Sequence, residues 1–246
     1  MLYIIATPIG NLDDISPRAI SVLSSSDIIL AEDTRVTRVL LSKYGIDRLL
    51  ISYHQHSKVQ KINEIISWLK EGKVLSLVSD AGTPGINDPG NFLIQEILKE
   101  LPDLKIIPIP GPNAAITALS VSGFPADKFV FLGFPPHKKG RQTFFKKIGD
   151  IEETVVFYES KRRILKALGE LKEFGKVDDP VKPPDGSHGA SRSIMVAREL
   201  TKQFETIYRG TVDEVLEQLN KTKVLGEFVV VIKNKKINKY DTGTTR

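Results

Sequence analysis

The sequence predicts an α/β fold of two α/β domains, the first with a mostly parallel sheet and the second with a mixed sheet. In the first half, short apolar runs alternate with segments in which apolar residues recur at helical spacing. After residue 123 this rhythm breaks, and candidate strands follow one another more directly. Continuously apolar strands joined by helices are typical of parallel sheets that helices cover on both faces. We therefore place the domains at residues 1–123 and 124–239, followed by a tail at 240–246.

The first half contains five candidate strands, at residues 2–6, 28–31, 49–51, 74–78 and 106–109. Ser16-Pro17 predicts a helix start, because a capping serine and a first-turn proline both suit that position. Gly72 predicts a helix end. The predicted buried stripes of three helices are Ile20 and Leu23, then Val36, Val39 and Leu40, then Ile62, Ile65, Ile66 and Leu69.

In the second half, strands are expected at residues 129–132, 154–158, 194–197, 205–208 and 228–232, with helices near 161–172 and 212–219. Residues 176–190 are rich in proline, glycine and aspartate and offer almost nothing to bury. We interpret them as a mobile surface loop whose role is open. The tail at 240–246 is expected to fray.

Composition excludes several classes of protein. The 246 residues are 41% hydrophobic and 26% charged, which is typical of a globular chain. There is no cysteine, which excludes disulfides and thiolate metal sites. His54 and His56 alternate along the chain, but two ligands fall short of a usual site, so no metal is expected. The N-terminus lacks a basic leader and an apolar run long enough to cross a bilayer, so we expect a soluble, cytoplasmic protein.

Positive charge is unevenly distributed along the chain. The net charge is +5, and residues 220–246 carry seven Lys or Arg against two acidic residues, which accounts for all of it. Within the neutral remainder, residues 133–149 hold five basic residues and no acid, and Lys161-Arg162-Arg163 follows. Each patch alone is consistent with a solvated helix face. Several together favour a polyanionic partner such as RNA.

Four candidate strands of the first domain end in unusual loops, at residues 7–11, 32–35, 79–90 and 108–113. Because open α/β sheets bind ligands at the carboxyl ends of their strands, we expect the loops to gather at one edge. In Ser79-Asp80-Ala81-Gly82-Thr83-Pro84, glycine and proline are denser than a plain turn needs, which favours a ligand role. The alternative is an ordinary strand-to-helix turn, and Asp88-Pro89 fits a helix cap. Neither a GxGxxG nor a GxxxxGK[ST] motif is present.

Several longer motifs carry a resemblance to a known family. They are ATPIGNLDDIS, AEDTRVTRVLLSKYGI, SLVSDAGTPGINDPG, PIPGPNAAITALSVSGFP, FLGFPPHKKGR, FYESKRR and VARELTKQFE. In this order they resemble the small-subunit ribosomal RNA 2′-O-methyltransferases (the RsmI family) of the tetrapyrrole-methylase superfamily. The resemblance implies two α/β domains with an S-adenosylmethionine cleft between them, and a homodimer. It also implies methyl transfer to the ribose 2′-oxygen of a cytidine in the 16S rRNA decoding region, with 16S rRNA, within the 30S subunit, as the partner.

The resemblance also implies site residues. The cofactor contacts it suggests are Pro8, Asp80, Gly82, Thr83, Pro84, Ile86, Asn113, Ala114, Tyr158 and Ala197. A ribose hydroxyl needs help in losing its proton, and the candidates for that catalytic role are Glu32, Asp33, Glu159, Glu199 and Lys202, none preferred over the others. Structural alternatives are a cap for Glu32-Asp33 and a salt bridge between Arg198 and Glu199. The RNA-binding candidates are Arg35, Arg38, Lys138, Lys139, Arg141, Arg162 and Arg163, while Phe134 or His137 could stack on a base.

Two features depart from the family pattern. The chain stops after the last expected strand, where some members continue into a small helical extension, and the 176–190 loop is longer. Two other functions remain open at this point: a small-molecule tetrapyrrole methylase, and an RNA-binding protein on the same scaffold without catalysis.

Overall fold

The structure is a computed structural model that describes residues 1–54, 59–88, 90–175, 177, 193–221 and 223–233. The chain divides into two compact units, Met1–Asn113 and Ala114–Arg246. His56, Pro89, the expected loop at 176–190, except Val177, and the expected tail at 240–246 lie outside the described residues. In the described part of the chain, no helix has the length and apolar character needed to cross a membrane.

The described residues of the first unit form a five-stranded sheet in the order β3-β2-β4-β1-β5. The strands are β1 (Leu2–Ile5), β2 (Ile28–Ala31), β3 (Leu49–Ser52), β4 (Leu75–Val78) and β5 (Ile106–Ile109), and all of their pairings are parallel. Every expected strand of this half is present, with ends that differ by one residue at most. The predicted parallel sheet is confirmed.

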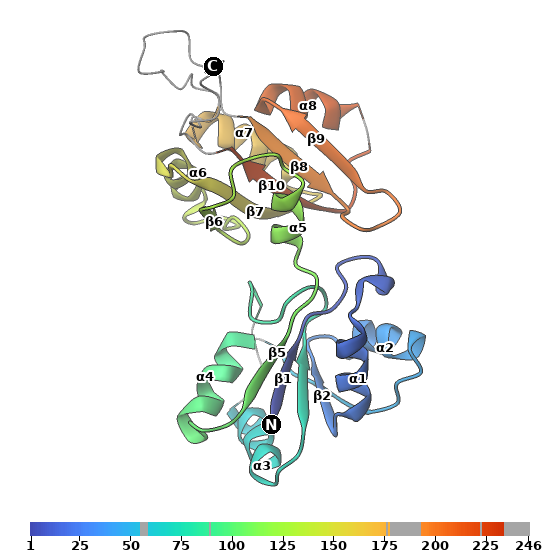
Figure 1. Ribbon diagram of the computed structural model, residues 1–246. Helices are drawn as coiled ribbons and strands as arrows, with labels where there is room; N and C mark the ends of the chain where they lie inside the picture. Colours follow the sequence, from blue (N-terminus) through green and yellow to red (C-terminus); the bar gives the residue numbers. More distant parts are fainter. Residues whose placement is uncertain (55–58, 89, 176, 178–192, 222, 234–246) are drawn as a thin grey trace, which may run out of the picture. The chain divides into compact units, whose positions relative to one another are not determined.

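Helices cover both faces of this sheet (Figure 1). Helices α1 (Pro17–Ser25) and α2 (Thr34–Lys43) pack on one face, where Leu23 and Leu40 join Ile5, Ile29 and Val78 in a buried cluster. Helices α3 (Val59–Lys70) and α4 (Gly90–Glu100) pack on the other face. The side chains of successive strand residues point to opposite faces. This alternation explains why strands apolar at every position carry helices on both sides.

Local signals set most helix ends correctly, but one predicted stripe is wrong. Ser16 caps α1 by accepting a hydrogen bond from the amide of Ala19, and Gly72 takes a left-handed φ of 83° after α3. In α2, however, Val36 and Val39 are 46% and 61% exposed. The buried residues of α2 are Thr37, Leu40 and Leu41. Because Thr37 on the buried face is polar, counting apolar residues alone does not identify that face of α2 correctly.

The second unit has a mixed sheet in the order β6-β7-β10-β8-β9. Its strands are β6 (Phe129–Phe131), β7 (Thr154–Ser160), β8 (Ile194–Arg198), β9 (Thr206–Gly210) and β10 (Glu227–Ile232). Strands β6 and β7 pair in parallel, and the other pairings are antiparallel. The mixed character predicted for this half is confirmed.

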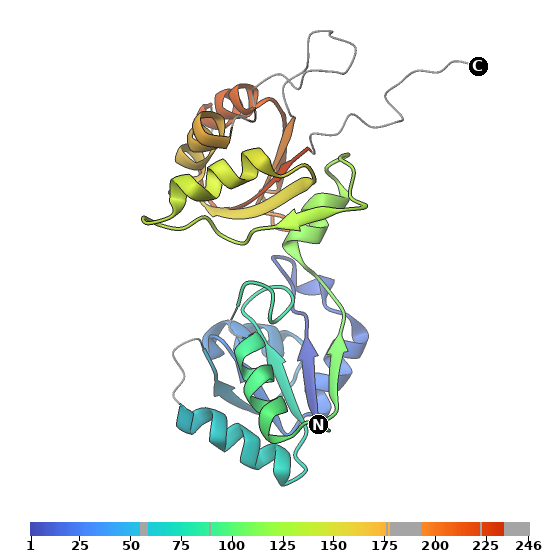
Figure 2. The ribbon, with the colours of Figure 1, turned by 90° about the vertical axis from the view of Figure 1, so that its left-hand side faces the viewer.

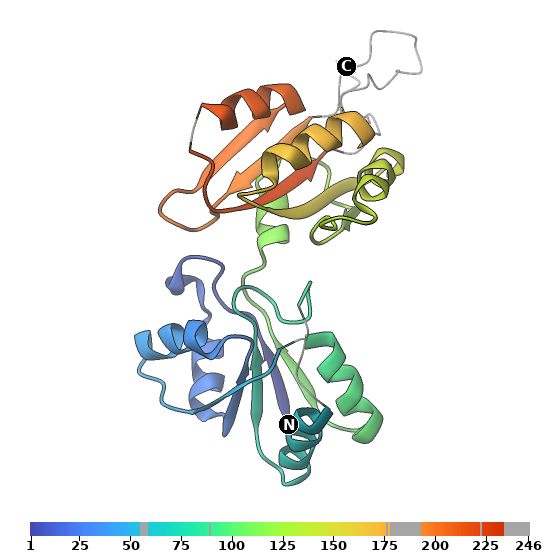
Figure 3. The same ribbon diagram turned by 180° about the vertical axis from the view of Figure 1, so that it is seen from behind.

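Helices α6 (Arg141–Asp150), α7 (Ile164–Gly175) and α8 (Val212–Asn220) cover one face of the second sheet, and α5 (Ala114–Ser120) lies on the other (Figure 2; Figure 3 shows α7 and α8 from behind). Side chains from α6, α7 and α8, including Phe145, Leu168 and Val215, form one core with Phe157 and Val230. Helix α6 was not predicted. Its apolar residues Phe144, Phe145 and Ile148 recur at helical spacing and could have indicated it.

Residues 114–123 group with the second unit, whereas the sequence pattern predicted them in the first domain. Helix α5 packs against β7 and β10, and Arg209 of β9 donates a hydrogen bond to the carbonyl of Val121 (2.6 Å). The division therefore falls at Asn113, ten residues before the predicted boundary. Gly123-Phe124-Pro125 interrupts the sequence pattern, but the chain passes from one unit to the other just before α5.

Candidate functional site

The loops that follow β1, β2, β4 and β5 are tied together at the carboxyl edge of the first sheet. Thr7 and Gly82 form a two-way backbone bridge, with N–O distances of 2.9 and 3.1 Å. The Thr83 hydroxyl donates to the carbonyl of Pro112 (3.1 Å), and the amide of Asp33 donates to Asp80 (2.8 Å). These bonds confirm the expectation that the four loops gather at one edge.

The glycines of the 79–90 loop have identifiable structural causes. A Cβ on Gly85, which has a φ of 86°, would lie 2.7 Å from Oδ1 of Asn91. A Cβ on Gly90 would lie 2.9 Å from the amide nitrogen of Gly85. The Asp88 carboxylate accepts from the amides of both Gly85 and Gly90, at the start of α4. This second half of the loop therefore leads into α4, and Asp88 binds the amide of the first residue of that helix, in agreement with its predicted capping role.

Three carboxylates, those of Glu32, Asp80 and Asp88, lie close to this edge. Burial raises the pKa of Glu32 above its ordinary value, and the negative charges of Asp80 and Asp88 raise it further. Beside them, Glu32, Tyr53, Pro84 and Asp88 line a cavity of about 10 Å³, which holds one water at most. This cavity itself is therefore too small to be the ligand site.

The cofactor candidates of the first unit lie on this tied surface. Pro8, Gly82 and Pro84 are buried in it, Asn113 is half-buried, and Ile86 is 46% exposed. Asp80 is exposed. S-adenosylmethionine carries a sulfonium and an ammonium charge against one carboxylate, so it is a net cation. Hydrogen-bonded backbone loops beside the exposed carboxylate of Asp80 fit such a group in chemical character.

The remaining cofactor candidates belong to the second unit. The Tyr158 hydroxyl accepts a hydrogen bond from the amide of Ala115 (3.1 Å), in the first turn of α5, which begins at Ala114. The ring of Tyr158 packs against Phe131 and Phe134, with centroid distances of 4.9 and 5.4 Å. Tyr158 therefore binds the first turn of α5 through its hydroxyl and packs against Phe134 through its ring. Ala197 is fully buried within β8.

Among the catalytic candidates, four are committed to other interactions. The Asp33 carboxylate caps α2 and pairs with Arg35. Hydrogen bonds from the side chain and the backbone of Arg35 lower the pKa of Asp33 to about 2. Lys202 pairs with Glu199 and Glu227. Although burial opposes the shift, hydrogen bonds from the Glu227 amide and Lys202 lower the pKa of Glu199. The cap predicted as an alternative for Asp33 is present, whereas Glu199 forms its salt bridge with Lys202 rather than with the predicted Arg198, whose Nε donates to the carbonyl of Leu225.

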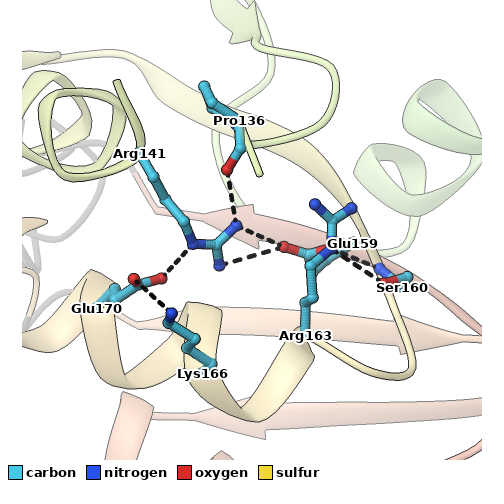
Figure 4. Close-up of polar contacts among 7 residues, drawn as sticks. All are labelled: Pro136, Arg141, Glu159, Ser160, Arg163, Lys166 and Glu170. Carbon is cyan, nitrogen blue, oxygen red and sulfur yellow. Dashed lines mark hydrogen bonds and ion pairs between the residues drawn. The ribbon is translucent and has the colours of Figure 1, made fainter. Parts of the chain in front are cut away.

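Glu159 is the fourth committed candidate, at the centre of a buried ion network (Figure 4). Its side chain is 0% exposed, accepts hydrogen bonds from Arg141 and the amide of Ser160, and forms an ion pair with Arg163. Nη1 of Arg163 is buried and has no hydrogen-bond partner among the residues that the structure describes. Glu32 is a partly buried carboxyl whose pKa is raised, whereas hydrogen bonds lower the pKa values of Asp33 and Glu199.

The basic candidates divide into exposed and buried residues. Lys138, Lys139 and Arg162 are exposed, and Arg35 and Arg38 line a hollow of about 570 Å³ along α2. Arg141 is only 5% exposed, and its guanidinium binds Glu159, Glu170 and the carbonyl of Pro136. We therefore correct the expectation that Arg141 contacts phosphate. Its partner Glu170 lies 29 residues away in the sequence, and no local pattern could have indicated the pair.

Among the described residues, no group of three or more histidine or acidic side chains could hold a metal ion. Of the two histidines that the sequence analysis considered as metal ligands, only His54 could be included in this search, because His56 lies outside the described part of the chain.

The chain matches known proteins over nearly its whole length. Residues 1–216 match the family model described as Tetrapyrrole (Corrin/Porphyrin) Methylases. It is 42% identical to "Ribosomal RNA small subunit methyltransferase I" of Thermotoga maritima over 95% of this chain and 98% of that protein. The protein of the same name from Escherichia coli O157:H7 is also 42% identical, over 98% of this chain and 80% of that protein.

Solved structures share the fold at low sequence identity. The methyltransferase CobJ superposes with a TM-score of 0.65 at 18% identity, covering 95% of this chain and 93% of that one. Diphthine synthase superposes with a TM-score of 0.66 at 13% identity, covering 94% and 89%.

Proposed function

The chain belongs to the tetrapyrrole (corrin/porphyrin) methylase family, and from this premise we propose that it methylates the ribose 2′-oxygen of a cytidine in the 16S rRNA decoding region. The observation that carries the proposal is the 42% identity, over 95% of this chain, to a protein named for small-subunit ribosomal RNA methylation. The methyl donor of the proposal is S-adenosylmethionine. The protein acts in the cytoplasm as a homodimer, with 16S rRNA in the 30S subunit as its partner.

The tied loops of the first unit are the proposed cofactor wall. Pro8, Gly82, Thr83 and Pro84 would present backbone to the cofactor, and Asp80 would face its positive charge. Ile86 would flank the adenosyl group, and Asn113 with Ala114 would contact it from the segment after β5. Tyr158 and Ala197 are the proposed contributions of the second unit. When bound, S-adenosylmethionine supplies an electrophilic methyl group, so the protein's task is chiefly alignment.

Glu32 is the proposed base for the ribose hydroxyl, because burial raises its pKa, whereas hydrogen bonds lower the pKa values of Asp33 and Glu199. We expect Glu32→Gln to lower the rate of methyl transfer by about 10²-fold, with the affinity for S-adenosylmethionine unchanged. Glu71→Gln, which removes an exposed carboxylate after α3, is the matched control. Equal rates for wild type and Glu32→Gln would contradict the assignment.

The raised pKa also fixes the sign of a stability change. A carboxylate whose pKa is raised on folding destabilises the protein once it is ionised, and this penalty disappears as the pH falls below the unfolded value of about 4.3. Glu32→Gln should therefore melt above the wild type at pH 7, and the two melting temperatures should converge toward pH 4. Differential scanning fluorimetry between pH 4 and 8 measures this difference.

Lys138 and Lys139 are the proposed phosphate contacts that the structure leaves exposed. We expect Lys138→Glu with Lys139→Glu to weaken RNA binding about tenfold or more. The slope of log affinity against log salt should become shallower by about 1.4, because each single-strand contact adds about 0.7. Lys146→Glu with Lys147→Glu makes the same charge change on α6 and is the control. Equal losses of RNA affinity in both variants would contradict a specific contact between the RNA and Lys138 and Lys139.

The proposed function is tested by incubating the protein and S-adenosylmethionine with 30S subunits from a strain that lacks the activity. Mass mapping of the 16S rRNA should find one new ribose methyl group on a cytidine of the decoding region. A methyl group on a base, or none on 16S rRNA, would overturn the substrate. Methylation of a tetrapyrrole instead would support the small-molecule alternative.

A further inference from the structure

The loop at residues 133–140 links β6 to α6 and carries the exposed side chains of His137, Lys138 and Lys139. Its first end is fixed to β7. The amide of Tyr158 donates to the carbonyl of Gly133 (2.9 Å), and the ring of Phe134 packs on that of Tyr158. These contacts hold only the first two residues of the loop, so another group must hold the part that carries the lysines.

Arg141 is that group (Figure 4). Its Nη1 donates to the carbonyl of Pro136 (3.2 Å), directly before His137, and its own amide donates to the carbonyl of Lys138 (3.3 Å). Arg141 therefore binds a backbone carbonyl on each side of His137, and Lys139 follows the second of them. A lysine at this position would keep the backbone bond to Lys138, but with one charged nitrogen and no planar fork its side chain could not bind Pro136, Glu159 and Glu170 together.

Two buried carboxylates fix the guanidinium of Arg141 in turn. Nε donates to Glu170 (2.6 Å), and Nη1 lies 3.4 Å from Oε2 of Glu159. The other oxygen of Glu159 accepts from the amide of Ser160 (2.8 Å) and forms an ion pair with Nε of Arg163 (2.9 Å). With its donors occupied and 5% of its surface exposed, Arg141 has no cation to offer an RNA phosphate.

We propose that Arg141 is a positioning residue for RNA recognition: it fixes the backbone from Pro136 to Lys138 so that Lys138 and Lys139 are presented to the substrate. The RNA part rests on the proposed function, whereas the loop-ordering part does not. The physical reason is preorganisation. A loop that is already ordered loses less conformational entropy when its lysines bind phosphate, so affinity falls when the anchor is removed although no phosphate contact is lost.

The loop-ordering part is tested by limited trypsin digestion, because trypsin cleaves after Lys138 and Lys139 only where the backbone can leave its folded conformation. Arg141→Lys keeps the charge and a trypsin site but loses the fork, and we expect cleavage at the two lysines to accelerate about tenfold. Glu173→Gln, which removes an exposed carboxylate from α7 and none of the partners of Arg141, is the control, and its cleavage rate should stay near that of the wild type. Unchanged cleavage in Arg141→Lys would overturn the inference.

The recognition part is tested by a double-mutant cycle for 30S affinity. Arg141→Lys should weaken binding about tenfold in the wild-type background and leave it unchanged in Lys138→Ala/Lys139→Ala, because it acts through those lysines. The affinity for S-adenosylmethionine should stay the same in all four proteins. Additive losses would show that Arg141 contacts the RNA itself and would overturn the positioning role.

Two further outcomes have defined meanings. If Arg141→Lys does not unfold cooperatively, Glu159→Gln replaces it, because this variant removes one charge that orients the guanidinium; an unchanged cleavage rate there would also overturn the inference. If the wild type does not bind 30S subunits, the proposed function fails, and the recognition part fails with it. The digestion experiment then still decides whether Arg141 orders the loop.

Discussion

Glu159→Leu is expected to destabilise the protein by about 3–5 kcal/mol, because it removes the negative charge between two arginines from a fully buried position. Arg141 would keep Glu170, but Arg163, whose Nη1 already has no partner among the described residues, would keep only the Ser160 hydroxyl. Urea unfolding followed by circular dichroism measures the change. It should appear as a lower midpoint at constant slope if unfolding stays two-state.

The isosteric variant separates charge from shape. Glu159→Gln keeps an oxygen that can accept from the arginines, so we expect a smaller loss, about 1–3 kcal/mol. Glu217→Gln, on the exposed face of α8, should change stability by less than about 0.5 kcal/mol. A loss below about 1 kcal/mol for Glu159→Leu would mean that water or a rearranged side chain neutralises the two arginines.

Gly82→Val is expected to weaken the affinity for S-adenosylmethionine by at least about 10²-fold. Gly82 has a φ of 83°, where a β-branched residue is strained by about 1–3 kcal/mol. Relief of that strain would break the two-way bridge to Thr7 that holds the 79–84 loop against the loop after β1. The added Cβ itself would lie at ordinary distances from Ile9 (3.5 Å) and Pro112 (3.7 Å), so the backbone rather than a clash causes the effect.

A second glycine provides the control for this prediction. Gly72 has the same φ of 83°, and a Cβ there would meet nothing within 4 Å. It lies after α3, at the opposite end of the sheet from the tied loops. Gly72→Val should therefore lose similar stability and keep its cofactor affinity, as measured by calorimetry. If Gly82→Val also keeps its affinity, the loop assignment is wrong.

Local patterns predicted the strands well for a physical reason. A strand buried on both faces is apolar at every position, as at Ile28–Ala31, and it shows this in four residues without reference to the rest of the chain. Because parallel strands end at a common edge, the meeting of the four loops followed from the same pattern. Helix α2 was harder, since its buried face includes Thr37 and its exposed face includes Val39.

The interactions that the sequence did not reveal are long-range. The sequence places Arg141 among lysines, which predicts an RNA contact, but its burial depends on Glu159 and Glu170 from β7 and α7. The hydrogen bond from Ala115 to Tyr158 joins residues 43 positions apart. Neither pairing leaves a trace in local spacing. The raised pKa of Glu32 likewise arises from its burial and from the two carboxylates of another loop.

The place of α5 has a practical consequence for any attempt to produce the second unit alone. The sheet face opposite α6, α7 and α8 carries Val156, Met195, Val229 and Val231, all 6% exposed or less. A fragment that starts at residue 124 would lack α5 and would leave part of this face in contact with water, where apolar patches promote aggregation. A soluble fragment should start at Ala114 or earlier, so that the helix is synthesised together with the sheet it covers.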